Sequence, residues 1–289
     1  MYAPAPGTAL YREPVGSEVI MDNIYQETTA TDTVKQYKDG ILTDVDATVV
    51  SECHFAIFLN DSYYAGMTKK KAFVEAMTGH CLVYTDLTPE YLNEFAVGYS
   101  FCNGEVIPER LSEVKMVEAD EENIVACVFV DGLMMKPRGG YVDHQIAYST
   151  RRDMNIALSP QKIIEEMKRF TDRSETFLST GAMHAAEIYD GNACIKFIED
   201  LNKAHAIYKV IGYSLMHGID LSGCAMLSTG RVFKENVHAC EMAGCHMIIS
   251  KSPPTRQAIE YAMEKDITLI GFARGDSFKV YCGEERIII

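Results

Sequence analysis

The chain has 289 residues, of which 47% are apolar and 24% are charged; these values are typical of a globular protein and exclude wholesale disorder. Its 27 Lys and Arg residues stand against 41 Asp and Glu residues, which gives a formal net charge of −14. A field of that sign opposes general binding to nucleic acids and to anionic membranes. A few local donors can still hold a small anion.

The lack of a recognisable secretory signal and the pattern of cysteines predict that the chain lies in a reducing compartment. Residues 1–30 lack the basic and apolar regions of a secretory signal, and no run of 18 apolar residues occurs. The nine cysteines are odd in number, stand in apolar surroundings and form no CxxC pair, which predicts free thiols. We therefore expect a soluble, cytoplasmic protein with no membrane segment.

The first part of the chain predicts an arm followed by a small antiparallel α+β portion. Residues 1–40 are rich in Thr, Ala, Pro, Asp and Glu without sustained periodicity, which indicates a loosely ordered arm. Residues 41–140 form the antiparallel portion. Strands are predicted at residues 55–59, 62–65 and 112–135. Thr88 is predicted to cap a helix that begins at Pro89.

Residues 141–289 predict an α/β domain. Short apolar segments alternate with helices of about a dozen residues, the pattern of βαβ units and of a partly parallel sheet covered on both faces. Helices are predicted at residues 163–170, 204–217, 232–243 and 256–264, and strands at residues 194–198, 224–227, 245–249 and 267–272.

Three consecutive strands of this domain end in small, donor-rich loops. Open sheets with parallel strands bind ligands beyond the carboxyl ends of their strands, and helix N-termini favour anions. Gly230 and Gly275 allow close approach of the backbone, and Arg231 and Arg274 can bind phosphate with two hydrogen bonds. The sequence therefore predicts a phosphate or nucleotide site, although each loop alone is explained by caps and turns.

Other candidate residues give weaker signals. Four zinc-type side chains occur within nine residues, but their spacing fits no structural zinc pattern, so we expect buried cysteines, surface histidines and no metal. They are His238, Cys240, Cys245 and His246. His184 is predicted either to contact a ligand or to cap a helix, and His205 either to lie at the surface or to have a functional role. Cys102 is the one loop-edge candidate for a reactive thiol.

Six short motifs follow one another in the second half of the chain. They are Thr180-Gly181-Ala182-Met183-His184-Ala185-Ala186, Glu199-Asp200, Lys209-Val210-Ile211-Gly212, Thr229-Gly230-Arg231, Ser252-Pro253-Pro254-Thr255 and Gly271-Phe272-Ala273-Arg274-Gly275. This ordered series resembles the signatures of the formate dehydrogenase accessory protein family (FdhD). With further matches at Phe55–Asn60 and Thr88–Gly98, the resemblance covers about residues 50 to 285.

The resemblance implies a three-layer fold similar to that of cytidine deaminases, without their zinc site. It implies a homodimeric protein that receives sulfur from a cysteine desulfurase and passes it to the molybdenum cofactor, bis(molybdopterin guanine dinucleotide), before insertion into formate dehydrogenase. The cofactor, or GDP, would lie on the strand-end loops. The residues expected to contact it are Thr180, Gly181, His184, Thr229, Gly230, Arg231, Ser252, Thr255, Phe272, Ala273, Arg274, Gly275, Asp276 and Ser277.

The chain departs from the family pattern where sulfur chemistry is expected. Family members carry a CxxC loop, but no cysteine lies between Met134 and Gly181, and the corresponding stretch at residues 148–155 has no thiol. The family's GRHN segment is replaced by Asn202-Lys203-Ala204-His205, and residues 69–82 resemble an insertion. Because a persulfide requires a thiolate, no catalytic residue is predicted.

Three functional hypotheses follow from these departures. In the first, the chain assists cofactor sulfuration through a substitute cysteine such as Cys102 or through a partner's thiol. In the second, it is a non-catalytic carrier, chaperone or sensor that binds the molybdenum cofactor or a guanine nucleotide. A third, a zinc deaminase, is disfavoured because the HxE…PCxxC ligand set is absent.

Overall fold

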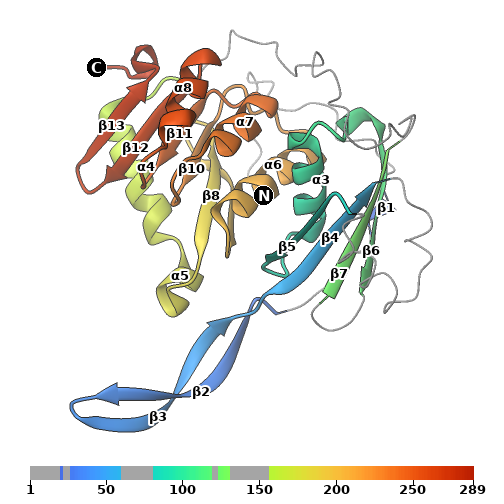
Figure 1. Cartoon of the computed structure of the whole chain (residues 1–289). Helices are drawn as coiled ribbons and strands as arrows, with labels where there is room; N and C mark the ends of the chain where they lie inside the picture. The colour runs from blue at the N-terminus through green and yellow to red at the C-terminus, as the bar shows by residue number, and fades with distance from the viewer. Residues whose placement is uncertain (1–19, 22–26, 60–80, 119–122, 131–155) are drawn as a thin grey trace.

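A six-stranded mixed sheet forms the centre of the larger part of the protein (Figure 1). The computed structural model describes residues 20–21, 27–59, 81–118, 123–130 and 156–289. The strands of this sheet are β8 (His184–Tyr189), β9 (Cys194–Asp200), β10 (Ala225–Ser228), β11 (Met247–Ser250), β12 (Thr268–Arg274) and β13 (Ser277–Cys282). Their order is β13-β12-β11-β10-β8-β9, with β10, β11 and β12 parallel and with β8 and β13 antiparallel to their neighbours.

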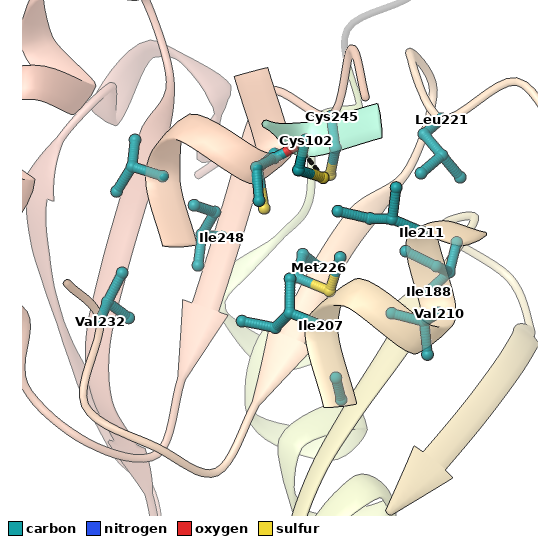
Figure 2. Close-up of a cluster of buried hydrophobic side chains, with 14 of the residues drawn as sticks. Cys102, Ile188, Ile207, Val210, Ile211, Leu221, Met226, Val232, Cys245 and Ile248 are labelled. Carbon is teal, nitrogen blue, oxygen red and sulfur yellow. Dashed lines mark hydrogen bonds between the residues drawn. The ribbon is translucent and has the colours of Figure 1, made fainter. Parts of the chain in front are cut away.

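Helices cover both faces of this sheet. The helices are α4 (Pro160–Asp172), α5 (Glu175–Thr180), α6 (Lys203–Met216), α7 (Lys234–Met242) and α8 (Arg256–Glu264), followed by the short η3 (Glu284–Arg286). Figure 2 shows Ile188, Met226 and Ile248 of the sheet in the core that α6, α7 and α8 cover. The next residues along each strand turn to the other face, where they join Ile163, Met167 and Phe170 of α4. The three-layer α/β fold predicted from the sequence is confirmed.

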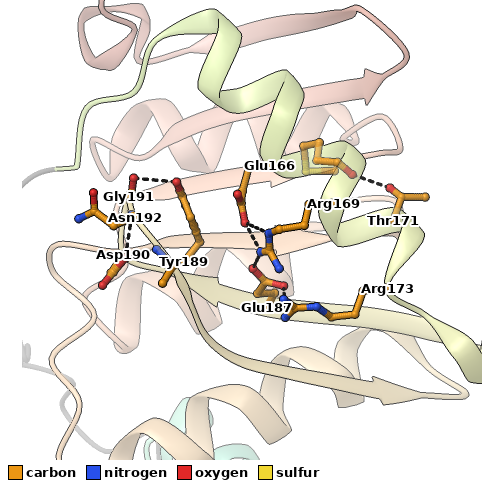
Figure 3. Close-up of polar contacts among 11 residues, drawn as sticks. Glu166, Arg169, Thr171, Arg173, Glu187, Tyr189, Asp190, Gly191 and Asn192 are labelled. Carbon is orange, nitrogen blue, oxygen red and sulfur yellow. Dashed lines mark hydrogen bonds and ion pairs between the residues drawn. The ribbon is translucent and has the colours of Figure 1, made fainter. Parts of the chain in front are cut away.

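Helix α4 is held to its face of the sheet by charged as well as apolar contacts. Glu187 of β8 is fully buried and is paired with Arg169 and, at 3.3 Å, with Arg173 (Figure 3). Glu166 lies on the other side of Arg169. Burial raises the pKa of Glu187, and the Arg169 guanidinium opposes that rise. The pair fixes α4 at a site that is separate from the strand-end loops.

The smaller part of the protein precedes this domain, as the sequence predicts. Its sheet has the order β1-β6-β7-β4-β5, and α3 packs on one face of it. The elements are β1 (Ile20–Met21), β4 (Cys53–Leu59), β5 (Val83–Leu87), α3 (Leu92–Cys102), η2 (Pro108–Arg110), β6 (Leu111–Glu118) and β7 (Asn123–Val130). The pairs β4–β5 and β6–β7 are antiparallel, but β4–β7 and β1–β6 are parallel, so the sheet is mixed. The expected antiparallel sheet is therefore only partly correct, because the alternation of apolar and polar residues along a strand does not reveal the direction of the neighbouring strand.

Two glycines bring the two parts into direct backbone contact. A Cβ added at Gly98 of α3 would lie 2.0 Å from the Tyr208 carbonyl oxygen, and one added at Gly212 of α6 would lie 1.9 Å from the Glu94 carbonyl oxygen. No side chain fits between helices at that separation. The pair therefore sets how closely α3 and α6 cross.

A two-stranded arm projects away from both parts (Figure 1). It consists of β2 (Thr29–Lys38) and β3 (Ile41–Val50), joined by Asp39 and Gly40, both at positive φ. An Asp-Gly pair at positive φ is typical of a type I′ hairpin turn. We expected no regular element before residue 41, and the strand at residues 29–38 corrects that expectation. Residues 30–44 of the arm are exposed, so burial imposes no simple apolar alternation on most of its sequence.

Other expectations fall outside the described residues or need correction. Several expectations concern segments outside the described ranges. They are the strand at residues 62–65, most of the insertion at 69–82, the stretch at 148–155, and residues 1–19 of the predicted N-terminal segment 1–40. Strands β8 and β13 were not predicted. Thr88 is not a helix cap, because α3 begins at Leu92 and the Thr88 side chain is buried. Within the described residues, no helix is long and apolar enough to cross a bilayer.

Candidate functional site

Four strands end, and two begin, at the same edge of the large sheet. Parallel pairing sets the carboxyl ends of β10, β11 and β12 side by side, with Ser228 opposite Ser250. Strand β8 runs the other way, so its first residue, His184, lies at this edge opposite Asp200, the last residue of β9. The structure thus brings together the three loops predicted from the sequence and adds the start of β8 and the end of β9.

Thr229 ties three of these segments together. Its hydroxyl accepts a hydrogen bond from the Ala185 backbone N–H at 3.0 Å and lies 3.2 Å from His184 Nδ1. The Ser252 hydroxyl donates to the Thr229 carbonyl at 2.8 Å. His184 is half-buried, and burial together with the nearby charges of Lys203 and Arg231 lowers its pKa. His184 therefore presents a neutral imidazole at neutral pH.

A first cationic cluster, named here the Phe233 cluster, consists of Lys203, Arg231 and Phe233. A Cβ at Gly230 would lie 2.4 Å from Lys203 Cδ, so the lysine side chain crosses the loop over this glycine. Its ammonium lies 3.7 Å from the centre of the Phe233 ring, and the Arg231 guanidinium lies 5.7 Å from the same centre. Burial, and then Arg231, lowers the pKa of Lys203. Among the described residues, neither cation has a carboxylate in an ion pair.

A second cationic cluster, the Phe272 cluster, consists of Phe272, Arg274 and Lys279. The Arg274 guanidinium and the Lys279 ammonium lie 5.4 Å and 4.9 Å from the centre of the Phe272 ring. Phe272 has a φ of +53°, an unfavourable conformation for an aromatic residue, and such strain is concentrated at functional sites. In the described part of the chain, Arg274 and Lys279 are again without an acidic partner in an ion pair.

The loop beyond Phe272 is a tight hairpin rather than an open anion-binding loop. Gly275 and Asp276 form its two-residue turn, with Gly275 at a φ of +64°, and Arg274 is opposite Ser277. Gly275, Asp276 and Ser277 are exposed, whereas Ala273 is buried in the core under α4. The hairpin returns the chain along β13 and thereby brings Lys279 to the ring.

Other predicted site residues have structural roles in this conformation. Thr180 ends α5 and donates to the Thr176 carbonyl at 2.6 Å, and Gly181 closes that helix at a φ of 72°. Thr255 caps α8 by accepting from the Ala258 N–H at 3.2 Å. These residues lie near the edge where the parallel strands end, and their contact with a ligand stays a prediction.

A fully buried ion pair between Lys209 and Asp200 holds the end of β9 next to the site. Lys209 Nζ lies 2.6 Å from Asp200 Oδ2 and donates to the Thr88 hydroxyl at 2.8 Å and to the Thr88 carbonyl at 3.0 Å. The Thr88 hydroxyl in turn donates to Asp200 at 3.0 Å. Burial opposes ionisation of Asp200, but the Lys209 ammonium outweighs it and lowers the pKa of Asp200 to about 2. Asp200 also accepts from the N–H of Asn202, the residue that caps α6, and so fixes the turn that presents Lys203.

His205 is buried, which excludes a surface position, one of the two alternatives left open by the sequence. It is only 7% exposed, and its ring meets Phe95 edge-on at 4.9 Å. Its Nδ1 lies 3.4 Å from Asp200, and its Nε2 lies 3.4 Å from the Thr85 hydroxyl. Lys203 and His205 leave the first turn of α6 in different directions, one towards the sheet edge and one into the junction of the two parts.

The described cysteines do not supply an exposed thiol at this edge. Cys102 ends α3 in the buried core shown in Figure 2, and burial raises its pKa, so the expectation of a loop-edge thiol is wrong. Cys53 lies near Lys209 and Asp200, yet burial raises its pKa to about 12. Cys194 is half-buried at the start of β9, at the opposite edge, and burial raises its pKa to about 11. These thiols are not activated in this conformation.

The candidate zinc ligands have other partners. His238 Nδ1 lies 3.0 Å from the Tyr261 hydroxyl and 3.2 Å from Glu241. Cys245 is buried and donates to the Cys224 carbonyl at 3.4 Å. Across the described ranges, no group of three or more His, Cys, Asp and Glu side chains is arranged to hold a metal ion.

Sequence reasoning missed Lys203, Phe233 and Lys279 as site residues. Phe233 lies just beyond the Thr229-Gly230-Arg231 motif and Lys279 on a strand that was not predicted. Lys203 replaces the Arg of the family's GRHN segment. This exchange of one cation for another was the feature of the sequence that could have identified Lys203 as a site residue.

Comparison with known proteins agrees with this fold and these motifs. The model of the FdhD/NarQ family matches residues 50–288. A sulfur carrier protein FdhD of Listeria monocytogenes is 28% identical over 270 residues, which cover 88% of this chain and 97% of that protein. A protein FdhD of Methanocaldococcus jannaschii is 30% identical over 250 residues, which cover 86% and 94% of the two chains.

A crystal structure shares the fold. It is that of a protein from Desulfotalea psychrophila described as a formate dehydrogenase accessory protein, with a TM-score of 0.70 and 19% identity over 91% of this chain and all of that one. The family match covers the whole large sheet, strands β4 to β7 of the smaller sheet and the α3–α6 crossing. The chain therefore belongs to the FdhD/NarQ family.

Proposed function

We propose that the chain is a formate dehydrogenase accessory protein that binds the molybdenum cofactor, bis(molybdopterin guanine dinucleotide), at the edge built by the Phe233 and Phe272 clusters. The observation that carries the proposal is the pairing of cations on aromatic rings, twice, at one sheet edge of a protein with a net charge of −14. Family membership and the names of the relatives support it.

The donor set fits a ligand with phosphates and flat bases. Two like charges on one ring repel each other, so an anion between them is favoured, and Arg231 and Arg274 can each bind a phosphate with two hydrogen bonds. The faces of Phe233 and Phe272 offer stacking surfaces for a base. When bound, the cofactor supplies the molybdenum centre of the target dehydrogenase, and the residues of this chain hold and orient its nucleotide arms.

Sulfur transfer requires a thiol that the described residues do not present at this edge. The burial of Cys53 and Cys102 favours the second hypothesis, a non-catalytic carrier that binds the molybdenum cofactor or a guanine nucleotide, over sulfuration through a substitute cysteine. Incubation with a cysteine desulfurase and cysteine, followed by persulfide detection by mass spectrometry, separates the two hypotheses. A persulfide on this chain that one Cys→Ala change abolishes would establish a substitute cysteine.

Calorimetric titration with GDP tests the binding site. We expect Arg231→Ala and Arg274→Ala each to raise the Kd for GDP by about tenfold or more, because truncating one partner of a desolvated charge pair costs about 2–5 kcal/mol. Arg110→Ala, at an exposed arginine of η2 in the smaller part, is the matched control and should bind as the parent does. Binding of GDP that both site variants leave unchanged would contradict the proposal.

A further inference from the structure

Helix α7 ends in a Schellman motif, in which two backbone hydrogen bonds close the last turn. Gly244 has a φ of 75° and donates its N–H to the Glu241 carbonyl at 3.0 Å. The Cys245 N–H donates to the Cys240 carbonyl at 2.8 Å. Residues joined by this second bond commonly bring their side chains into contact. The end of the helix therefore places one thiol against another.

The same second bond ends three other helices of the described chain without pairing two thiols. It joins Glu105 to Ser100 at the end of α3, Ile219 to Ser214 at the end of α6, and Ile267 to Ala262 at the end of α8. The side chains of those pairs are hydroxyl, carboxylate or alkyl groups, which do not bond covalently to each other. The backbone geometry is thus common to these helix ends, and the thiol pair is particular to α7.

The two thiols of α7 are hydrogen-bonded to each other and buried. The Cys240 thiol donates to the Cys245 sulfur, and the Cys245 thiol donates to the Cys224 carbonyl at 3.4 Å. Both side chains are fully buried in the core in which Figure 2 shows Cys245. The bond from Cys240 lowers the pKa of Cys245 and raises the pKa of Cys240. Cys245 is therefore the thiol of the pair that ionises more readily.

The backbone separation of the pair suits a disulfide. The Cα atoms of a disulfide lie about 4.4–6.8 Å apart. The covalent bonds on either side of the 2.8 Å hydrogen bond limit the Cα atoms of Cys240 and Cys245 to a separation of about 7 Å. A disulfide here joins the last turn of α7 to the segment that leads into β11. The folded chain already holds these two segments together, so the cross-link needs no change of fold.

We propose that Cys240 and Cys245 form a reversible disulfide, which locks the end of α7 to the segment before β11 under oxidising conditions. The oxidant is hydrogen peroxide. The Cys245 thiolate attacks one oxygen, the O–O bond breaks, and hydroxide leaves a sulfenic acid on Cys245. The Cys240 thiol then attacks the sulfenic sulfur, the S–O bond breaks, and water leaves with the thiol proton. In total, two thiols lose two electrons and two protons, and one hydrogen peroxide becomes two waters.

Burial determines when this lock closes. Neither sulfur is accessible in the folded chain, so peroxide reaches Cys245 when the last turn of α7 opens locally. Once the turn closes again, the disulfide prevents further opening. The other end of α7 begins at Phe233, the ring of the Phe233 cluster. The lock therefore holds in place a helix that presents one of the candidate site residues.

Peptide mass spectrometry of the full chain tests the proposal. Trypsin releases residues 235–251 as one peptide, which contains Cys240, Cys245 and no other cysteine. After treatment of the folded protein with hydrogen peroxide and alkylation in denaturant, this peptide should be unalkylated and about 2 Da lighter than the reduced peptide. Dithiothreitol should restore the reduced mass. Urea below the unfolding transition should speed the oxidation about severalfold, because it increases local opening.

Matched variants identify the thiols and the effect of the lock. Cys240→Ala and Cys245→Ala should each abolish the unalkylated peptide. Cys102→Ala and Cys224→Ala, which remove other thiols of the same core, should leave its formation unchanged. Amide hydrogen exchange of residues 240–246 should be about tenfold slower in the oxidised parent than in the reduced parent. Cys240→Ala should show no such difference.

Two results would overturn the proposal. One is a peptide 235–251 that remains fully alkylated while other cysteines of the chain are oxidised. The other is a peptide 235–251 that is linked to the peptide of Cys102 or Cys224, or that carries a sulfinic acid without any internal disulfide. The readout is the mass of one peptide and requires no ligand, so the test is independent of the proposed function.

Discussion

Lys209 and Asp200 form an ion pair of 2.6 Å with both side chains fully buried, and Thr88 from the smaller part completes it. The pair belongs to α6 and to the end of β9, whereas Thr88 lies between β5 and α3. One buried charge pair therefore ties together the edge strand of the large sheet, the helix that carries Lys203 and the smaller part.

Removing one member of this pair should destabilise the whole protein. Asp200→Ala leaves the Lys209 ammonium buried without a counter-ion, and the loss in free energy of unfolding is expected to be about 3–5 kcal/mol. Urea unfolding measures it. Asp190→Ala, at an aspartate of the β8–β9 turn that accepts only from neighbouring backbone N–H groups, is the comparison and should cost much less. Equal losses for the two variants would contradict the role assigned to Asp200.

The same pair should make the free energy of unfolding decrease at acidic pH. Asp200 titrates at about 2 when folded and near 3.8 when unfolded, so its contribution is complete above the unfolded value and is lost as the pH falls from about 5 towards 2. The shift corresponds to about 2 kcal/mol. Unfolding free energies measured between pH 2.5 and 6 should fall less steeply for Asp200→Asn than for the parent. An identical slope would show that other carboxylates set the acid limb.

The crossing of α3 and α6 predicts a reversal of the usual effect of glycine. In an ordinary helix, Gly→Ala stabilises by about 1 kcal/mol. Here the new methyl group of Gly98→Ala or Gly212→Ala meets backbone of the opposite helix, which cannot turn aside, so each change is expected to destabilise by about 3 kcal/mol. Thermal unfolding checks the sign. A rise in Tm for either variant would mean that the two helices separate at little cost.

The parallel strands of the large sheet, and the loops at their carboxyl ends, could be predicted from the sequence because their signals are local. Alternating apolar strands and helices fix which loops meet at one edge, and this placed Thr229, Ser252 and Arg274 together. Contacts between distant segments gave no such signal. Thr88 has the sequence context of a helix cap, but its hydroxyl bonds to Asp200, 112 positions away, and the start of α3 moves to Leu92.

Two further omissions have the same physical origin. Lys203 reaches Phe233 only because Gly230 leaves room for its side chain, a close approach that spacing along the chain does not encode. The β2–β3 hairpin was not predicted because neither of its faces is deeply buried, although Asp39-Gly40 marks its turn. Local pattern thus predicts the elements and the edge, while the side chains that complete the site depend on tertiary contacts.

His184 provides a readout of charge at the proposed site. Burial first, and then Lys203 and Arg231, lowers its pKa, so an anion that neutralises these two cations should raise it towards its ordinary value. NMR titration of the imidazole with and without GDP measures the change, and guanosine, which lacks phosphates, should leave the pKa where it is. Lys203→Ala should raise the pKa of His184 in the free protein and reduce the further rise on adding GDP. If GDP binds and the His184 pKa does not rise, the phosphates lie away from the Phe233 cluster, and the Phe272 cluster alone would hold them.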